Sequence, residues 1–374
     1  MGCAQPLAVS TVYRCVRLLS ESVANLPLRF LRMNADGVFV DDRRDRLHYL
    51  LSVQPDEPYN AFDFWSQAIQ QMLLQGNAYI VPQYDPMTMQ ISRLVLCTRG
   101  TVSYDQLNRQ YTVMDPTNRL SGTFAEEEVI HLKNLSLDGQ TGVSTLTFAR
   151  LTADIAQTGD RETLNRFANG GNVRGLVGND TSVRGFGEYQ DTELDATAAD
   201  LDEQFQAGKK IVAVPGQVKF SQLSLSSTDM QFLESRKFTV REICRFFGVH
   251  PSFVFDDTSN NYKSAEMANV AFLSNTLNPM LRKIECELHR KLIVPELCCE
   301  RRFEFDRRSL YACDLQSRVQ YQTQTIAAGI YTVNDWRRVE NMPAVAGGDT
   351  PLVSANLKGL QALLQEGEPG AADE

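Results

Sequence analysis

The sequence lacks the motifs that most often carry catalysis. It contains no G-x-x-x-x-G-K-[ST] phosphate loop, no G-x-G-x-x-G turn after a strand and no H-E-x-x-H pair. The nearest approach to a G-x-S-x-G nucleophile turn, GVST at 142–145, fails at its last position. These absences argue against common nucleotide hydrolases, dinucleotide-dependent enzymes, zinc peptidases and serine hydrolases. We therefore expect no enzymatic activity, no catalytic residue and no cofactor.

Histidine is scarce, and its four residues are scattered over His48, His131, His250 and His289. His131 ends an apolar stretch, where packing or hydrogen bonding explains it better than metal ligation. His250 precedes Pro251, whose ring restricts the backbone before it without any chemistry. The carboxylate runs at 126–128 and 256–257 are typical of solvated acidic turns. The sequence therefore predicts no metal site.

The eight cysteines form no C-x-x-C pair, and only Cys298 and Cys299 are neighbours. Cys15, Cys97 and Cys244 stand where a small apolar residue would fit. This pattern predicts free, mostly buried thiols in a reducing cytosol. No apolar run approaches the roughly 20 residues that span a bilayer, and the N-terminus lacks the pattern of a secretion signal. We expect no contact with a membrane.

A formal net charge of −9 argues against a protein that grips DNA by bulk attraction. It is compatible with a protein that lets DNA slide past, because tightly held phosphates would stall the movement.

The stretch from 229 to 247 is predicted to be a helix with two contrasting faces. Residues at i, i+3, i+4 and i+7 form its apolar face: Val240, Ile243, Cys244 and Phe247. Residues spaced by four form a positive stripe on its other side: Lys237, Arg241 and Arg245. Gly248 and Pro251 end the helix.

A polar loop follows this helix and contains no large aliphatic residue. It consists of Asp256, Asp257, Thr258, Ser259, Asn260, Asn261, Tyr262 and Lys263. The next helix is predicted to start near Ser264, with leucine, isoleucine and valine along one face to about 292. Pro279 lies inside it and is expected to kink it near Asn275.

The part before residue 133 is predicted to be a helix-flanked, largely antiparallel β region. A helix from about 6 to 25 is followed by a hairpin around Asp36-Gly37, and Asn60 caps a helix over 61–75. Short strands are expected at 78–84, 91–97, 101–104, 110–114 and 128–132.

A helix over 144–168 leads into a compact insert over 172–227. The insert is predicted to hold a strand at 175–178, an acidic helix with Leu194, Ala198, Leu201 and Phe205 inward, and a hairpin turning at Pro215-Gly216. A strand at 301–306 is expected to return to the first domain. A helix over 309–328 and a short Asn-capped helix follow, and the tail EGEPGAADE is expected to be disordered.

Several sequence motifs resemble those of one known family, and they occur in the same order along the chain. They are CVRLLSESVANLPL, LLQGNAYI, NGGNVRGLV, REICRFFGVHP, NNYKSAE, NPMLRKIECELHRKL and GIYTVNDWRRVENMPAVAGGD. The resemblance is to the portal, or head–tail connector, proteins of tailed double-stranded DNA bacteriophages. It is strongest to the siphovirus-type branch with long non-contractile tails, which includes prophages.

The resemblance implies an α+β portal fold with named parts. These are a wing over 1–143, a stem helix over 144–170, a clip insert over 171–227, a second stem helix over 228–250, a tunnel loop with a kinked helix over 251–292, a wing return over 293–330, and a short crown-like C-terminal segment over 331–374.

It also implies a homo-oligomeric ring, usually a dodecamer, at the portal vertex of a virion assembled in the bacterial host cytoplasm. The implied partners are the terminase large subunit, major capsid and scaffolding proteins, a head–tail adaptor, and double-stranded DNA that passes without sequence specificity. Residues 256–263 would project toward that DNA as a tunnel loop. The positive stripe would touch phosphates or bridge subunits, and the insert would contact terminase and adaptor.

Two other interpretations stay open. The chain could be another head component, such as a minor capsid or adaptor protein, or a packaging enzyme, which ATP hydrolysis by the purified chain would reveal. The positive stripe could also be an ordinary solvated helix face that pairs with Glu234 and Glu242. In a symmetric ring, the same stripe would instead become stacked belts of positive charge.

Overall fold

A computed structural model describes residue 7 and residues 9–168, 175–179, 191–206, 218–222, 226–255, 262–307 and 315–352. It has two compact units, Met1–Phe305 and Asp306–Glu374. Helices and small antiparallel sheets are mixed, and the α+β class is confirmed. The unit boundary falls inside the segment 293–330 that was expected to return to the wing. The named parts remain predictions.

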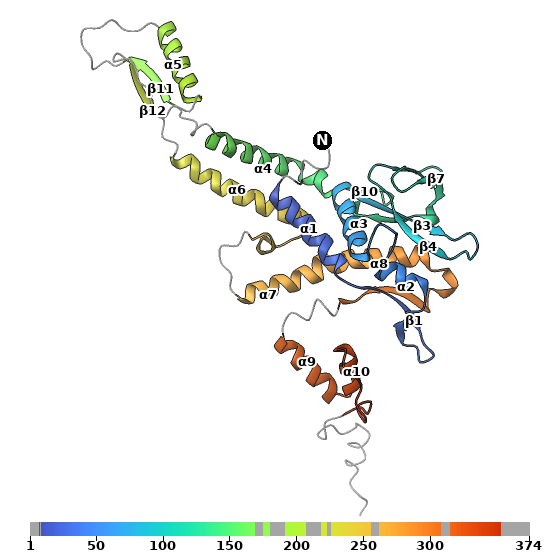
Figure 1. The fold of residues 1–374 in the computed structure, drawn as a ribbon. Coiled ribbons are helices and arrows are strands. Elements are labelled where there is room, and N and C mark those ends of the chain that lie inside the picture. The colour runs from blue at the N-terminus through green and yellow to red at the C-terminus, as the bar shows by residue number, and fades with distance from the viewer. Residues whose placement is uncertain are drawn as a thin grey trace, which may run out of the picture. The chain divides into compact units, whose positions relative to one another are not determined.

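Two amphipathic helices pack together in the first unit. Helix α1 (Ser10–Ala24) buries the seam that its threes-and-fours spacing predicts, and it packs against α3 (Ala61–Gln75) (Figure 1). The Asn60 side chain caps α3 by accepting a hydrogen bond from the Asp63 N–H at 2.8 Å. Gly76 ends α3 in the left-handed conformation. Both ends of α3 are as predicted.

The first sheet confirms the predicted hairpin and the returning strand. It has the order β13-β1-β2, formed by β1 (Leu28–Met33), β2 (Phe39–Asp41) and β13 (Arg301–Phe305). Both pairings are antiparallel, with Phe30 opposite Phe303. A short helix, α2 (Arg46–Ser52), packs against β1.

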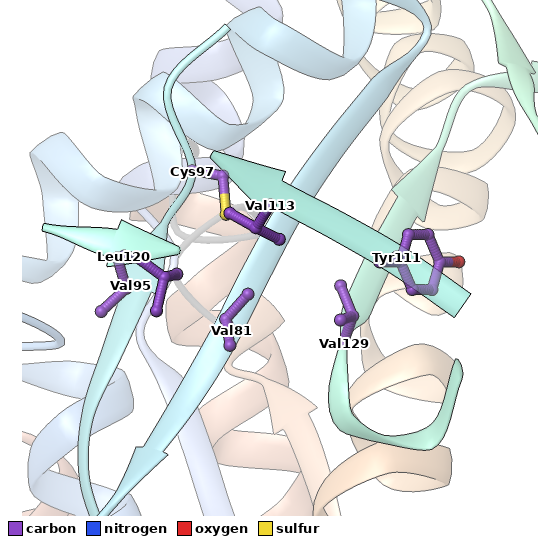
Figure 2. Packing of buried hydrophobic residues seen from close by; sticks show 7 residues of the cluster. All are labelled: Val81, Val95, Cys97, Tyr111, Val113, Leu120 and Val129. Atoms are coloured by element: carbon purple, nitrogen blue, oxygen red, sulfur yellow. The ribbon is translucent and has the colours of Figure 1, made fainter. Parts of the chain in front are cut away.

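Two further sheets share a small core. One has the order β4-β3-β8, and the other β5-β6-β7. Their strands are β3 (Asn77–Tyr84), β4 (Ile91–Leu96), β5 (Val102–Asp105), β6 (Gln110–Asp115), β7 (Leu120–Ala125) and β8 (Ile130–Lys133). Apolar residues of both sheets, joined by flanking residues, gather in one buried cluster (Figure 2): Val81, Val95, Cys97, Tyr111, Val113, Leu120 and Val129.

Strand β7 was missed by the sequence patterns. It reads LSGTFA, in which small and polar residues hide the alternation, yet it pairs with β6 over six positions. The strand expected at 128–132 is present as β8 but begins two residues later, because a 3₁₀ turn over Glu126–Glu128 precedes it.

The two long helices are α4 (Thr145–Ala168) and α6 (Ser226–Phe247), and they run side by side (Figure 1). A hairpin of two short strands, β9 (Leu135–Ser136) and β10 (Gly142–Val143), leads into α4. The intervening chain holds β11 (Gly175–Asn179), α5 (Asp191–Gln206) and β12 (Val218–Gln222), with β11 and β12 antiparallel. Leu201 of α5 is buried as predicted. The expected turn at 215–216 lies outside the described residues.

The start of α4 is fixed by a close backbone approach. A Cβ atom added to either Gly76 or Gly142 would overlap the carbonyl oxygen of the other residue. The Asn77 side chain brackets Gly142, since its Nδ2 donates to the Gly142 carbonyl at 2.8 Å and its Oδ1 accepts from the Gly142 N–H at 2.7 Å. The Ser144 hydroxyl donates to the Leu74 carbonyl at 2.7 Å. Only glycine fits at both positions.

The helix that follows the polar loop departs from expectation at its proline. Helix α7 (Tyr262–Ala271) runs into a π-helical segment, η4 (Phe272–Leu277), and then into α8 (Asn278–Leu292). Pro279 stands in the first turn of α8, where its missing N–H is tolerated. The irregularity at Asn275 is therefore a π segment directly before the proline.

The second unit contains α9 (Leu315–Ala327) and α10 (Val333–Val339). Thr332 caps α10 through a capping box with Asp335, so the expected asparagine cap was wrong. Asn334 is instead buried, where its side chain donates to the Val345 carbonyl at 3.0 Å and to Asp349 at 2.9 Å.

The predicted free thiols are confirmed for the described cysteines, but the prediction that most of them are buried is wrong for half of these. The six described cysteines are free thiols. Cys15, Cys97 and Cys244 are buried as expected, whereas Cys286, Cys298 and Cys299 are exposed.

His131 is buried in a hydrogen-bond network, as expected for a structural histidine. Its Nε2 lies 2.7 Å from Asn77 Oδ1, and its Nδ1 lies 3.0 Å from the Tyr111 hydroxyl. Because the Asn77 oxygen can only accept, Nε2 carries the proton and Nδ1 accepts from Tyr111. Burial, together with the nearby cations led by Lys133, lowers the pKa of His131 from 6.5 to about 3.

The pKa of His131 predicts a pH dependence of stability. Between pH 6.5 and about 3 the unfolded state binds the proton and the folded state does not. The free energy of unfolding should therefore fall with falling pH, by up to about 1.4 kcal/mol per pH unit from this residue. Urea titrations across this range should show a shallower slope for His131→Gln than for the wild type. Equal slopes would contradict the assignment.

Replacing Gly76 by alanine should destabilise the first unit by about 3 kcal/mol, because the new Cβ overlaps backbone and φ is +90°. Gly37→Ala is the matched control, since Gly37 also has positive φ but nothing lies within 4 Å of its added Cβ. It should cost about 1 kcal/mol. Urea denaturation measures both, and similar losses would refute the close-approach explanation.

Candidate functional site

Helix α6 has the two faces that its sequence predicts. Ile243, Cys244 and Phe247 are buried, and α6 packs against both α4 and α1. Val240 is half-buried. The buried thiols of Cys15 on α1 and Cys244 on α6 are hydrogen-bonded, and this contact and burial raise the pKa of Cys15 far above its ordinary value. The thiols are therefore packing groups between two helices.

The positive stripe lies on the exposed side of α6. Lys237, Arg241 and Arg245 are all exposed. Arg245 forms an ion pair with Glu242 one turn away. The expectation of a solvated face partly paired with Glu242 thus holds for Arg245. Whether the stripe meets DNA or another subunit remains a prediction.

The C-terminal end of α6 is tied to the π segment. Gly248 has a φ of +64° and closes the helix, and the Val249 N–H donates to the Cys244 carbonyl at 2.9 Å. The Thr276 hydroxyl donates to the Gly248 carbonyl at 2.6 Å. This bond joins the end of α6 directly to η4.

The turn after α6 is held by Arg14 of helix α1. This turn is a 3₁₀ segment, η3 (Pro251–Val254), capped by His250. The Arg14 Nε donates to the Phe253 carbonyl at 3.2 Å, and its guanidinium carbon lies 5.2 Å from the centre of the Phe255 ring. The Phe253 and Phe272 rings are 5.0 Å apart. Helix α1 and the π segment therefore both contact residues 251–255 and fix their course.

Phe255 is unusual in both conformation and exposure. It has a φ of +63°, which is costly for a bulky residue, and it is 85% exposed. Its ring contact with Arg14 offsets part of this cost.

The predicted tunnel loop is only partly described. Asp256, Asp257, Thr258, Ser259, Asn260 and Asn261 lie outside the described residues. Tyr262 and Lys263 form the first two residues of α7, so the helix begins two residues earlier than expected.

The sequence patterns missed Arg14 and Thr276. Arg14 lies 239 positions before Phe253, and local periodicity carries no information about such a contact. Within the described ranges, no group of three or more histidine, cysteine or acidic side chains is placed to hold a metal ion. Among the described helices, none is long and apolar enough to cross a membrane.

Solved structures define the class of this fold. The crystal structure of an HK97-family phage portal protein from Corynebacterium diphtheriae has a TM-score of 0.60 to this chain at 16% identity, over 83% of this chain and 96% of that one. A chain in the neck of a native gene transfer agent particle, computed with twelve-fold cyclic symmetry, has a TM-score of 0.58 at 20% identity, over 91% and 92%. The fold is that of the phage portal proteins.

Sequence comparison gives the family. The family described as phage portal protein matches residues 10–341. The portal protein of Enterobacteria phage HK97 is 28% identical over 370 residues, covering 97% of this chain and 85% of the relative. The chain belongs to the phage portal protein family.

Replacing Arg14 should loosen the turn at 251–255. Arg14→Ala removes a charge-assisted hydrogen bond and a cation–π contact, together worth about 1–3 kcal/mol. Amide hydrogen exchange over 250–255 should speed up accordingly. Arg17→Ala is the matched control on the same helix, because it removes exposed contacts with Glu21 and Tyr13, which both lie on α1 itself. Equal exchange in both variants would show that Arg14 does not hold the turn.

Proposed function

We propose that this chain assembles into a ring of about twelve copies at one vertex of a phage or prophage capsid. Double-stranded DNA would enter through the ring during packaging and leave through it at ejection. The family match over residues 10–341 carries this proposal. The likeness to a chain from a particle neck of twelve-fold symmetry supports the ring.

The parts of the chain would have mechanical roles. The β region before residue 143 would be the wing, and α4 with α6 the stem. Residues 171–227 would form the clip that contacts the terminase large subunit during packaging and a head–tail adaptor afterwards. The major capsid and scaffolding proteins would surround the wing. Residues 331–374 would form a short crown-like segment.

Two groups of residues would meet the cargo or the neighbouring copies. Residues 256–263 would project toward DNA as the tunnel loop. Lys237, Arg241 and Arg245 would either touch phosphates or bridge subunits. The net charge of −9 fits a channel that passes DNA without holding it.

A second function, as another head component, receives less support. The family match spans nearly the whole chain, including both long helices and the segment between them. The sequence also lacks the phosphate loop that a packaging ATPase requires. The role proposed here is structural.

The ring is tested by the mass of the purified chain in solution and by negative-stain images. Particles of about twelve times 42.0 kDa with a central hole are expected. A ring needs a heterologous interface that closes on itself, so a compact dimer with two-fold symmetry and no central opening would contradict the proposal.

A further inference from the structure

Helix α4 carries an apolar stripe that the described part of its own chain leaves exposed. Phe148, Leu151 and Ile155 are 48%, 74% and 50% exposed. Their i, i+3, i+7 spacing places them on one face of the helix. The face that packs inside the chain is a different one, marked by Ala149 and Ala153. Three large apolar side chains in a row on a helix surface are typical of an interface.

Helix α6 carries a second exposed stripe with the same spacing. Phe238, Arg241 and Arg245 also stand at i, i+3 and i+7, and Phe238 is 60% exposed. Phe238 thus lies on the same side of the helix as two residues of the positive stripe. We call Phe238, Arg241 and Arg245 the α6 stripe, and Phe148, Leu151 and Ile155 the α4 stripe. Aromatic and arginine side chains are the residues most enriched at protein interfaces and at their energetic centres.

We propose that the α4 stripe of one copy packs against the α6 stripe of the next copy. This inference rests on the proposed ring and names the surfaces that build it. Residues Phe148, Leu151 and Ile155 form one side of the contact. Residues Phe238, Arg241 and Arg245 form the other.

Cyclic assembly requires this kind of pairing. In a ring, every copy meets its neighbours through two different surfaces, so each chain must present both halves of the contact. The α4 stripe and the α6 stripe are different, and each chain carries both on its two adjacent helices. Each stripe spans eight residues, or about 10 Å along a helix, so the two can contact each other over their whole length.

The chemistry of the two stripes is complementary. The α4 stripe is uncharged and offers one aromatic and two aliphatic side chains. The α6 stripe offers an aromatic ring and two guanidinium groups with long apolar stems. Arginine stems cover apolar surface while the charged ends reach solvent or lie over an aromatic face. The interface would therefore bury Leu151 and Phe238 without burying an unpaired charge.

This pairing assigns Arg241 and Arg245 to subunit contacts instead of DNA. A surface that only touches phosphates needs cations and gains little from an exposed phenylalanine. Glu242 also pairs with Arg245 and reduces the net charge that the helix presents. Phe238 therefore favours a protein partner for this side of α6.

Two single substitutions, one in each stripe, test the pairing. Leu151→Asp and Phe238→Asp change exposed positions, so each isolated chain should keep its fold. Leu164→Asp is the matched control: Leu164 is 66% exposed on the same helix, but its position lies about 140° around the axis from Leu151. Analytical ultracentrifugation should show rings for the wild type and the control, and no rings for either stripe variant.

Mixing the two stripe variants identifies the pairing itself. The Leu151→Asp chain keeps an intact α6 stripe, and the Phe238→Asp chain keeps an intact α4 stripe. An equimolar mixture should form one-to-one pairs that neither variant forms alone, and these pairs should not close into rings. A benzophenone-bearing phenylalanine analogue at position 151 should crosslink to α6 of another copy, and the same analogue at position 164 should not.

The outcomes separate this inference from the proposed function. A wild-type chain that never forms rings would overturn the ring and the inference together. Rings that persist in both stripe variants would leave the ring intact and overturn the pairing. The pairing is also overturned if the mixture forms no pairs, or if the crosslink from position 151 falls within the same chain, for example on residues 353–374.

Discussion

The contact between the backbones of Gly76 and Gly142 is the constraint on which the arrangement of the first unit depends. At this point the end of α3, the start of β3 and the β10 strand converge, and α4 begins three residues after Gly142. A side chain at either position would push the long helix away from the β region. Because α4 is 24 residues long, a small change in its direction at Thr145 becomes a larger displacement at its far end.

The same contact connects the start of α4 to a buried polar network. Asn77 holds Gly142 with both atoms of its amide, and the orientation of that amide is set by the neutral ring of His131. His131 is in turn positioned by Tyr111 from the neighbouring sheet. The two sheets and the base of α4 are therefore linked through four side-chain hydrogen bonds in an apolar setting, where each bond is expensive to leave unmade.

Helices of this chain were largely predictable from the sequence, because a buried face repeats every three or four residues. The periodic patterns predicted α1, α3, α4 and α6 to within a few residues of their observed ends. Strand β7 was not predictable, since LSGTFA has too few apolar side chains to show alternation and is held by pairing with β6. At the start of α10, Thr332 and Asn334 are both good caps, and only the buried turn at Val345 decides between them.

The candidate site was predictable where it is local and unpredictable where it is not. Spacing by four was enough to find the exposed Lys237, Arg241 and Arg245. The apolar stripe of α4 could not be separated from a core face by its sequence, because periodicity does not say which of two faces is covered. Arg14 and Thr276 act on residues 239 and 28 positions away, respectively, and such contacts become visible only in the folded chain.

The π segment before α8 has a consequence for how this region changes. A π turn holds more than four residues and breaks the 3.6-residue phase, so residues on α7 and α8 do not share one continuous helical face. The faces of α7 are thereby offset in rotation from those of α8, which is anchored by the buried Leu281, Ile284 and Leu288. If the extra residue moved along the helix by one turn, the side chains it passed would rotate by about 100° while the core under α8 stayed in place.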